Sequence, residues 1–330
     1  MFKKVLSGAL LVATAVGLAG CAVDESETSL TVYSGRSETL VQPLIDKFTE
    51  ETGIEVEVRY AGSAELAAQI LEEGQNSPAD VFFSQDAGAL GAVGKAGLLQ
   101  TIPQDLLDLV GSSYSAADGS WVGVSGRVRV LNYNPEKVTD LPNFVFDLED
   151  PIWKGRIAIA PTNASFQAFV TAMRVVHGDE ETSRWLEAMA VNAVIYEENS
   201  AILEAVEQGL VDAGLINHYY WFAMEKEVGA GAMKSKLAQF AEGDVGNLIN
   251  AAGVGLLSDS GAGKKFVEFL LSPESQEYFA SETSEYPLIP GVPVGAGLSP
   301  LGEIPAPKID LSDLDSLEQT LALIRAAGLI

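Results

Sequence analysis

The chain has 330 residues, 47% of them hydrophobic, and its 46 Asp and Glu against 20 Lys and Arg give a formal net charge of −26. This length is enough for two domains of ordinary size. Binding to nucleic acid or docking on an anionic lipid surface is disfavoured, because either would need clustered Lys and Arg. We expect the acidity to reflect a solvated surface, with weak gathering of cations as the alternative.

The N-terminal segment MFKKVLSGALLVATAVGLAGC has two lysines, an apolar run and then small residues. This pattern predicts a secretory signal peptide over residues 1–21, because the apolar run is short for a membrane span. Its end, Leu18-Ala19-Gly20-Cys21, resembles the lipobox of bacterial lipoproteins. Cys21 is the one cysteine of the chain and is the expected lipidation site. We predict an exported protein, anchored through Cys21 at the outer face of the cell membrane or in the periplasm, with 22–28 as a polar tether.

From residue 29 the sequence alternates between strand-like and helix-like segments. Predicted strands cover 30–34, 54–60 and 79–84, and predicted helices cover 39–53, 63–74 and 86–97. Such a β-α-β series predicts a mostly parallel sheet with helices on both faces. Ligands of such sheets lie beyond the carboxyl ends of the strands. The turns that begin at Gly35, Ala61 and Gln85 are therefore expected near a ligand.

A long strand, 121–134, separates this series from a second one. Predicted strands follow at 155–160, 193–196, 214–217 and 246–257, with predicted helices from about Ser165, at 183–190, 200–209, 264–272 and 274–282. In the tail, Leu311, Leu314, Leu317, Leu321 and Ile324 form the stripe of one amphipathic helix. We predict two α/β lobes joined by two long hinge strands. Lobe I would comprise 29–128 and 250–300, and lobe II 129–249 and 301–330.

Motifs of enzymes are mostly missing from the sequence. It contains no GxSxG, HExxH, paired CxxC or GxGxxG after a strand, and SDSGAGKKF departs from a P-loop at Ser258 and Lys265. Of the two histidines, we expect His177 to be a surface or capping residue. An exported enzyme would need a nucleophile and base, for which Ser37 with His218 is the pair that we can nominate.

Residues 214–221, GLINHYYW, place two adjacent tyrosines after an apolar run. Neighbouring side chains on a strand point to opposite faces, whereas on the first turn of a helix, or in a loop, Tyr219 and Tyr220 can converge. Packing as core aromatics is one interpretation of the pair. The other is a metal site, because Fe(III) prefers hard anionic oxygen and a bound cation can deprotonate a phenol whose ordinary pKa is near 10.

Six segments, in this order, resemble those of the periplasmic ferric-ion-binding proteins, which are the substrate receptors of bacterial ABC iron importers. They are LTVYSGRSE, SPADVFFSQD, VSGRVRVLNYN, YEENSA, GLINHYYW and KFVEFLLSPESQ, and the resemblance covers 29–330. It implies a two-lobed type II periplasmic-binding-protein fold, in which each lobe is a mostly parallel sheet flanked by helices. It also implies that Tyr219 and Tyr220 bind Fe(III).

The resemblance does not supply clear ligands from the first lobe. Ser37 and Gln85 stand where one branch of the family has His and Glu, and both are poor ligands for a trication. Ser37 is equally well interpreted as a helix N-cap and Gln85 as a turn residue. Tyr133 resembles a third tyrosine position of other branches, with structural packing as the alternative.

The resemblance further implies a synergistic anion, carbonate or citrate, on the second lobe. Matching residues are Asn163, Ala164, Ser165, Asn199 and Asn217, and a helix N-terminus offers free N–H groups to an anion. Arg36 and Arg127 are further anion-binding candidates, because a guanidinium binds a carboxylate or carbonate through two hydrogen bonds. For Arg129, which shares a strand face with Arg127, we favour a surface ion pair.

These inferences predict a monomeric, lipid-anchored receptor that closes on Fe(III), or on a ferric chelate, and delivers it to the membrane subunits of an ABC importer. A receptor of the same fold for an anionic or organic solute, such as a phosphonate, is the alternative. Its support is the presence of Ser37 and Gln85 and of the arginines, and NHYYW opposes it. An exported enzyme is a further alternative from another class.

Overall fold

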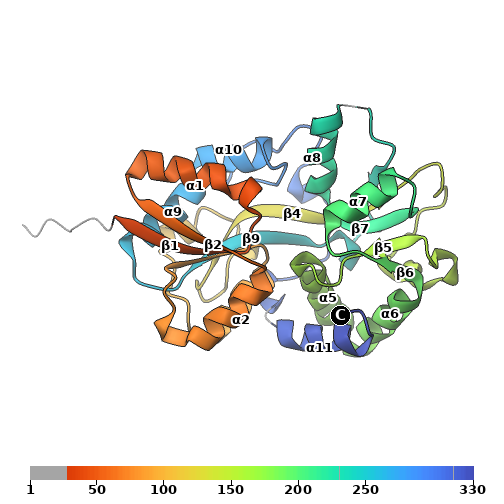
Figure 1. Ribbon diagram of the computed structural model, residues 1–330, viewed down its shortest axis with the longest axis horizontal. Helices are drawn as coiled ribbons and strands as arrows, with labels where there is room; N and C mark the ends of the chain where they lie inside the picture. The colour runs from red at the N-terminus through yellow and green to blue at the C-terminus, as the bar shows by residue number, and fades with distance from the viewer. Residues whose placement is uncertain (1–27, 230, 315) are drawn as a thin grey trace, which may run out of the picture.

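The computed structural model describes residues 28–229, 231–314 and 316–330. Residue Cys21, the predicted signal peptide and 22–27 of the predicted tether lie outside the described residues. The described chain forms two lobes side by side, with the N-terminal strands in one lobe and α5 to α8 in the other (Figure 1). Within the described part, no helix is long and apolar enough to cross a membrane.

The first lobe is built on three parallel strands, β1 (Ser29–Ser34), β2 (Glu55–Tyr60) and β3 (Val81–Ser84). Its helices are α1 (Glu38–Thr52), α2 (Ser63–Glu73), α3 (Ala87–Lys95), α9 (Gly261–Leu270) and α10 (Pro273–Ser281), with a short α4 (Gln104–Leu107). Helices α1, α9 and α10 lie above the sheet in Figure 1 and α2 lies below it. Both faces of the strands are thereby covered, as the β-α-β pattern predicts.

The second lobe repeats this plan with parallel strands β5 (Ile157–Ile159), β6 (Ala193–Ile195) and β7 (Ala213–Asn217). Its helices are α5 (Ala164–His177), α6 (Asp179–Asn192), α7 (Asn199–Glu207), α8 (His218–Val228) and α11 (Leu317–Ala326). Helices α7 and α8 lie above the sheet in Figure 1, and α5, α6 and α11 lie below it.

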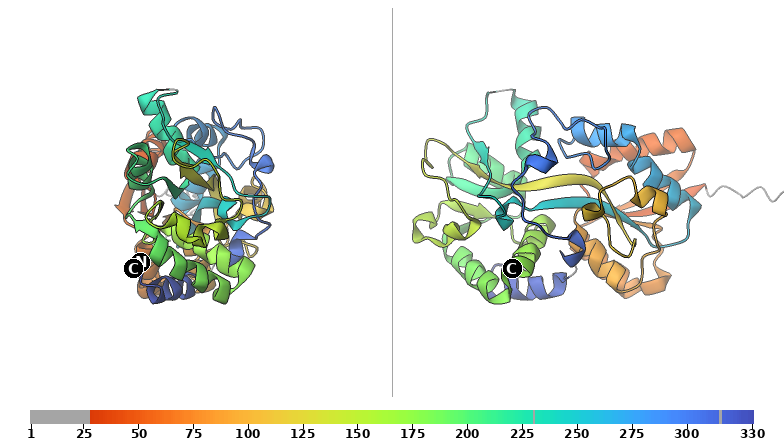
Figure 2. Two further views of the ribbon diagram at one scale, coloured as in Figure 1. Left: turned by 90° about the vertical axis from the view of Figure 1, so that its right-hand side faces the viewer. Right: turned by 180° about the vertical axis from the view of Figure 1, so that it is seen from behind.

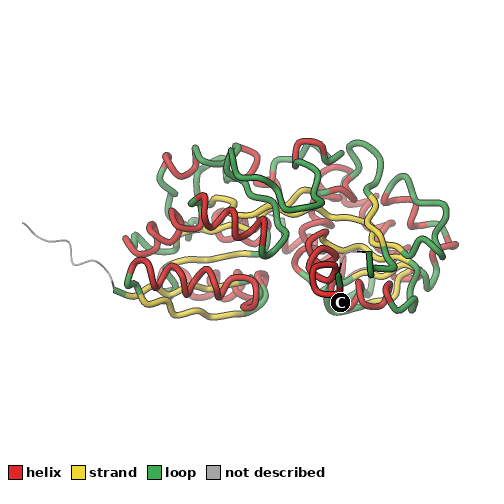
Figure 3. The backbone as a smooth tube through the Cα atoms, turned by 90° about the horizontal axis from the view of Figure 1, so that it is seen from above, coloured by secondary structure: helices red, strands yellow, loops and turns green. Residues whose placement is uncertain are grey.

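Two antiparallel strands, β4 (Val122–Tyr133) and β9 (Ile249–Leu256), run from one lobe into the other (Figures 2 and 3). Strand β4 pairs with β9 up to Val128, and from Arg129 onward with β7 and with β8 (Lys236–Ala238). The sheet therefore runs as β2-β1-β3-β9-β4-β7-β5-β6, with β8 beside β4. The lobe borders at 128/129, 249/250 and 300/301 remain our proposal.

Two predicted elements differ from the structure. The strand predicted from residue 246 begins at Ile249, because Asp244 caps a 3-10 turn over Val245–Asn247. The single tail helix is instead a 3-10 turn, Leu311–Leu314, followed by α11. The turn packs on α3 and α5, and α11 packs on α5, α6 and α3. Leu311, Leu314 and Ile324 therefore join the same apolar core although they lie in two separate elements.

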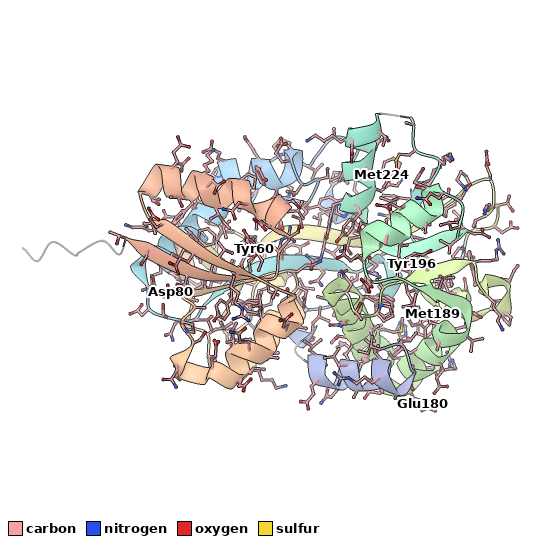
Figure 4. The ribbon with its side chains drawn as sticks, in the orientation of Figure 1. Tyr60, Asp80, Glu180, Met189, Tyr196 and Met224 are labelled. Carbon is pink, nitrogen blue, oxygen red and sulfur yellow. The ribbon has the colours of Figure 1, made fainter. Side chains whose placement is uncertain are left out.

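Side chains fill the space between sheets and helices in both lobes, as Figure 4 shows around Tyr60 in the first lobe and Met189 in the second. The largest buried cluster of apolar residues is shared by the lobes, since it includes Phe48 of α1, Trp185 of α6 and Leu314 of the tail. Closely packed apolar residues thus connect the lobes in addition to the hinge strands.

Candidate functional site

The two adjacent tyrosines lie where β7 ends and α8 begins. Asn217 is the last residue of β7 and His218 the first of α8, which places Tyr219 and Tyr220 in the first helical turn. Their rings stack with centroids 4.4 Å apart and planes at 30°. Tyr219 is 3% exposed and Tyr220 is partly buried. The first turn of α8 thus presents both rings together. Figure 4 marks this helix by Met224.

The surroundings of Tyr220 disfavour its phenolate when no cation is bound. Burial raises the pKa of Tyr220 well above 10, and the neighbouring Tyr219 raises it further, while Asn199 and Arg127 act in the opposite direction. The hydroxyl is therefore protonated at neutral pH. A cation bound at this position would have to displace its proton.

Arg127 of β4 is a buried cation without a partner. Its side chain is 1% exposed, and none of its three guanidinium nitrogens has a hydrogen-bond acceptor in the described part of the chain. Burial lowers the pKa of Arg127, while Tyr219, Glu285 and Asp86 exert an opposing electrostatic influence. A buried charge is costly unless it is paired, so this guanidinium is suited to hold an anion.

Arg36, by contrast, already has a counter-ion. It follows β1, is buried, and donates from Nη2 to Oε2 of the fully buried Glu285 at 2.5 Å. Thr283 donates to the same oxygen at 3.1 Å. Burial opposes the charge of Arg36, yet its pKa is raised because of Glu285. Among the described residues, Arg36 keeps one buried nitrogen, Nε, without a hydrogen-bond partner, whereas all three guanidinium nitrogens of Arg127 lack one.

The surface ion pair that we favoured for Arg129 is wrong. Its side chain is 2% exposed and donates to Ser165 Oγ at 3.3 Å and to the carbonyl of Leu215 at 3.1 Å. The guanidinium also lies over the rings of Phe166 and Phe169, 5.5 and 5.3 Å from their centroids. Burial lowers the pKa of Arg129 to about 9. Arg129 is buried because α5 covers this part of β4, although the sequence alone indicated an exposed residue.

Three of the predicted anion-binding residues meet at the start of α5. Asn163 caps this helix, its Oδ1 accepting from Ser165 N at 3.0 Å and from Ser165 Oγ at 2.6 Å. Asn199, at the start of α7, donates to Asn163 Oδ1 at 3.2 Å and to Ser165 Oγ at 3.3 Å. Asn199 Oδ1 and Asn217 Nδ2 are buried and unpartnered in the part that the structure describes. These groups surround the tyrosine pair with further polar atoms.

Both ring nitrogens of His218 are occupied. Nδ1 accepts from the backbone N–H of Val128 at 3.1 Å, so Nε2 carries the proton and donates to the carbonyl of Ser284 at 2.9 Å. Burial lowers the pKa of His218 to about 4. Ser37 is exposed and bonds to Thr39 at 2.9 Å instead. The Ser37–His218 pair that an enzyme would need is therefore not formed.

The remaining predicted residues, Ser37, Gln85 and Tyr133, show no hydrogen bond or ring contact with the tyrosine pair within the described part of the chain. Ser37 occupies the N-cap position of α1, as predicted, although its side chain makes no capping hydrogen bond. Gln85 is partly buried at the end of β3, and its N–H donates to Ser63 Oγ at 2.8 Å. Tyr133 pairs with Ala213, four residues along β4 from the Arg129–Asn217 pair. At about 3.3 Å per residue, the Cα atom of Tyr133 lies ~13 Å along the strand from that of Arg129.

Two buried carboxylates, Asp86 and Glu285, lie near Arg127 and were not among the predicted site residues. Asp86 caps α3 through Oδ1, and its Oδ2 has no partner among the described residues. Its position next to Gln85, in a turn expected near the ligand, could have indicated it. Glu285 lies 249 residues from Arg36, and no sequence pattern connects them. Across the described residues, no group of three His, Cys, Asp or Glu could hold a metal ion, so a metal would need other ligands such as phenolates.

The sequence and the fold are similar to those of known solute-binding proteins. The family model described as bacterial extracellular solute-binding protein matches residues 30–282. The Fe(3+)-binding periplasmic protein of Serratia marcescens is 34% identical over 98% of this chain and 97% of its own. The crystal structure of iron-bound HitA from Pseudomonas aeruginosa is 37% identical, covers 92% of this chain and 100% of its own, and has a TM-score of 0.87.

A structure from Trichodesmium, in complex with iron and citrate ligands, is 29% identical over 92% of this chain and 100% of its own, with a TM-score of 0.76. Together these likenesses confirm the predicted α/β periplasmic-binding-protein fold and an extracytoplasmic solute-binding protein. They also exclude the enzyme alternative, because the family binds solutes without transforming them. The chain belongs to the bacterial extracellular solute-binding proteins and, among them, to the family of periplasmic ferric-iron-binding proteins.

Proposed function

We propose that this chain is an exported receptor that binds Fe(III) between its lobes through the phenolates of Tyr219 and Tyr220, together with an anion. The observation that carries the proposal is the stacked tyrosine pair, of which Tyr219 is buried and Tyr220 partly buried, together with Arg127, a buried guanidinium without a hydrogen-bond partner among the described residues. The names of its relatives support the same cargo, since the Serratia marcescens protein is Fe(3+)-binding and HitA is iron-bound.

The chemistry of the site favours a hard trication. Two phenolates supply two anionic oxygens, which Fe(III) prefers to neutral nitrogen or sulfur. The charge of the ion would displace the proton that burial otherwise retains on Tyr220. Carbonate or citrate, held by Arg127 with Asn199 and Asn217, would complete the ligand shell, and the Trichodesmium complex holds iron with citrate. Ser37 and Tyr133 have no place in this proposed shell.

Delivery would depend on the hinge. We infer that ion binding favours a closed arrangement of lobe I (29–128 and 250–300) on lobe II (129–249 and 301–330), with bending at β4 and β9. The membrane subunits of an ABC importer would recognise this closed form and receive the ion. Lipidated Cys21 would keep the receptor at the membrane surface.

The first experiment uses the chain without residues 1–21, stripped of metal and titrated with ferric citrate in the presence and absence of bicarbonate. We expect a visible tyrosinate-to-iron charge-transfer band that is lost in Tyr219→Phe and in Tyr220→Phe. Tyr133→Phe is the matched control and should keep the band. Dependence of the band on bicarbonate would identify carbonate as the anion.

A missing band under every condition would contradict the ferric proposal. The receptor for an anionic or organic solute would then be tested by calorimetric titration with a phosphonate. The anchor is tested separately: the full chain should incorporate a labelled fatty acid, and Cys21→Ser should not. Equal incorporation by Cys21→Ser would refute lipidation at Cys21.

A further inference from the structure

His218 connects three segments that are far apart in the sequence. It begins α8, is 2% exposed, and bonds to Val128 of β4 and to Ser284 in the turn after α10. These partners lie 90 and 66 residues away. Both are backbone groups, which cannot follow the ring by a change of rotamer. The ring is further enclosed by Tyr286, with centroids 4.9 Å apart.

The turn that receives the Nε2–H bond is itself held in place. Ser284 has φ 56°, and within the described part of the chain it is the single non-glycine residue with positive φ. Such a conformation persists only where its surroundings enforce it. Here Glu285 N bonds to the carbonyl of Phe279 at 2.9 Å, and Tyr286 exchanges two backbone bonds with Gly126 at 2.8 and 2.7 Å. The carboxylate of Glu285 also binds Arg36.

We propose that His218 is a positioning residue, which links the tyrosine pair of the second lobe to the 283–286 turn of the first lobe and thereby slows release of the bound ion. This inference rests on the proposed ferric function. The residue after His218 is Tyr219, so the link acts at the start of the helical turn that holds the cargo. Val128 lies at the proposed lobe border on the hinge strand β4, next to Arg129, which pairs with β7, whereas Ser284 lies within lobe I. We therefore expect separation of the lobes to break the Ser284 bond and to keep the Val128 bond.

Two amide substitutions separate the halves of this link. In His218→Asn, Oδ1 can replace Nδ1 as the acceptor for Val128, but no donor reaches Ser284. In His218→Gln, the amide nitrogen can replace Nε2 as the donor to Ser284. His218→Phe keeps a ring and removes both bonds. His177→Phe is the matched control, because His177 is exposed at the end of α5.

The measurement is the rate at which the iron-loaded protein loses its visible band to excess EDTA, together with the melting temperature of the metal-free protein. We expect His218→Asn and His218→Phe to release iron about tenfold faster, as loss of one hydrogen bond implies. We expect His218→Gln and His177→Phe to release it at nearly the wild-type rate. The band should keep its position, because the tyrosines remain the ligands.

Release at the wild-type rate in all His218 variants would overturn the inference. A second outcome would also overturn it: the release rates of all three His218 variants rise in proportion to the fall in melting temperature of the metal-free protein, and His218→Gln does not restore slow release. His218 would then only fill space. A wild-type protein without a band would instead refute the ferric function itself. The Asn and Gln pair keeps the test decisive even if His218→Phe does not fold.

Discussion

At the scale of single residues, the site is governed by which buried charges have partners. Arg36 is neutralised by Glu285, and Arg129 lies over aromatic rings and donates to two oxygens. Arg127 has no such partner among the described residues. Its uncompensated burial reduces the stability of the anion-free protein, and an anion that pairs with it would recover this free energy.

We therefore expect Arg127→Met to stabilise the metal-free protein by about 1–4 kcal/mol, the range seen when buried charges are replaced by apolar groups. The same variant should bind iron more weakly and lose the effect of bicarbonate. Urea unfolding and the ferric titration measure the two effects. Arg129→Met is the control and should destabilise the protein, because Arg129 has partners. Destabilisation by Arg127→Met would show that the guanidinium is satisfied by groups other than an anion.

Removing the counter-ion of Arg36 should have the opposite consequence. We expect Glu285→Gln to lower the free energy of unfolding by about 3–5 kcal/mol, because it leaves a buried charge unpaired. The comparison is Glu282→Gln, which breaks an exposed ion pair with Lys226 at 3.3 Å and should change stability far less. Both are measured by urea unfolding. Equal effects of the two substitutions would argue against an important role of the buried pair.

At the scale of elements, the junction of β7 with α8 positions the tyrosines, and its packing is tight. A Cβ at Gly214 of β7 would lie 2.2 Å from Cγ2 of Ile202 on α7. Only glycine lets the strand approach the helix this closely. Strand β7 in turn sets where α8 starts.

We expect Gly214→Ala to cost about 1–3 kcal/mol of stability through overpacking. It should also weaken the charge-transfer band, because movement of β7 displaces the tyrosine pair. Gly302→Ala is the control, since a Cβ there meets nothing within 4 Å. Urea unfolding and the ferric titration are the measurements. A neutral Gly214→Ala would mean that α7 can move away without disturbing the site.

The capped turn before β9 should respond to pH. Asp244 is buried and accepts from Gly246 N at 2.7 Å and Val145 N at 3.2 Å, and burial raises its pKa above 3.8. The folded state therefore favours the protonated carboxyl of Asp244. Its contribution to the free energy of unfolding is complete below the pKa of the unfolded state and is lost as pH rises through the pKa of the folded state. We expect the stability of Asp244→Asn relative to wild type to increase with pH from about 4 upward.

The reverse behaviour is expected of Asp118, because hydrogen bonds from Ser120 lower its pKa. The contribution of Asp118 to the free energy of unfolding is present above the pKa of the unfolded state and is lost as pH falls through the pKa of the folded state. Relative to wild type, Asp118→Asn should therefore lose stability as pH rises through that range. Unfolding free energies measured at a series of pH values test both variants. Slopes of the same sign would contradict this account.

At the scale of the whole molecule, the lobes are joined by more than the hinge strands. The 3-10 turn Leu311–Leu314 packs on α3 of the first lobe and on α5 of the second, and Leu314 is fully buried. We expect Leu314→Ala to cost about 2–5 kcal/mol. Hydrogen–deuterium exchange should become faster in both α3 and α5. Acceleration confined to α11 would show that the turn does not couple the lobes, and exposed Leu210→Ala is the control.

Much of this architecture could be predicted from the sequence, because hydrophobic periodicity is a local property. The helix predicted at 39–53 is α1 at Glu38–Thr52, and the strand predicted at 121–134 is β4 at Val122–Tyr133. The convergence of Tyr219 and Tyr220 at a helix start follows from an apolar strand that ends in polar residues. These features depend on neighbours along the chain, which the sequence specifies directly.

The tertiary structure alone decided how the polar side chains of the site are paired. Arg129 is buried because α5 covers its strand, Arg36 pairs with Glu285 from 249 residues away, and His218 bonds to two distant backbone groups. In each case burial makes an unpaired polar group costly, and the partner is supplied by whichever element folds against it. The sequence by itself determined the lobes and the tyrosine pair. Long-range packing determined that Arg127, among the arginines around the pair, has no hydrogen-bond partner on any guanidinium nitrogen within the described residues.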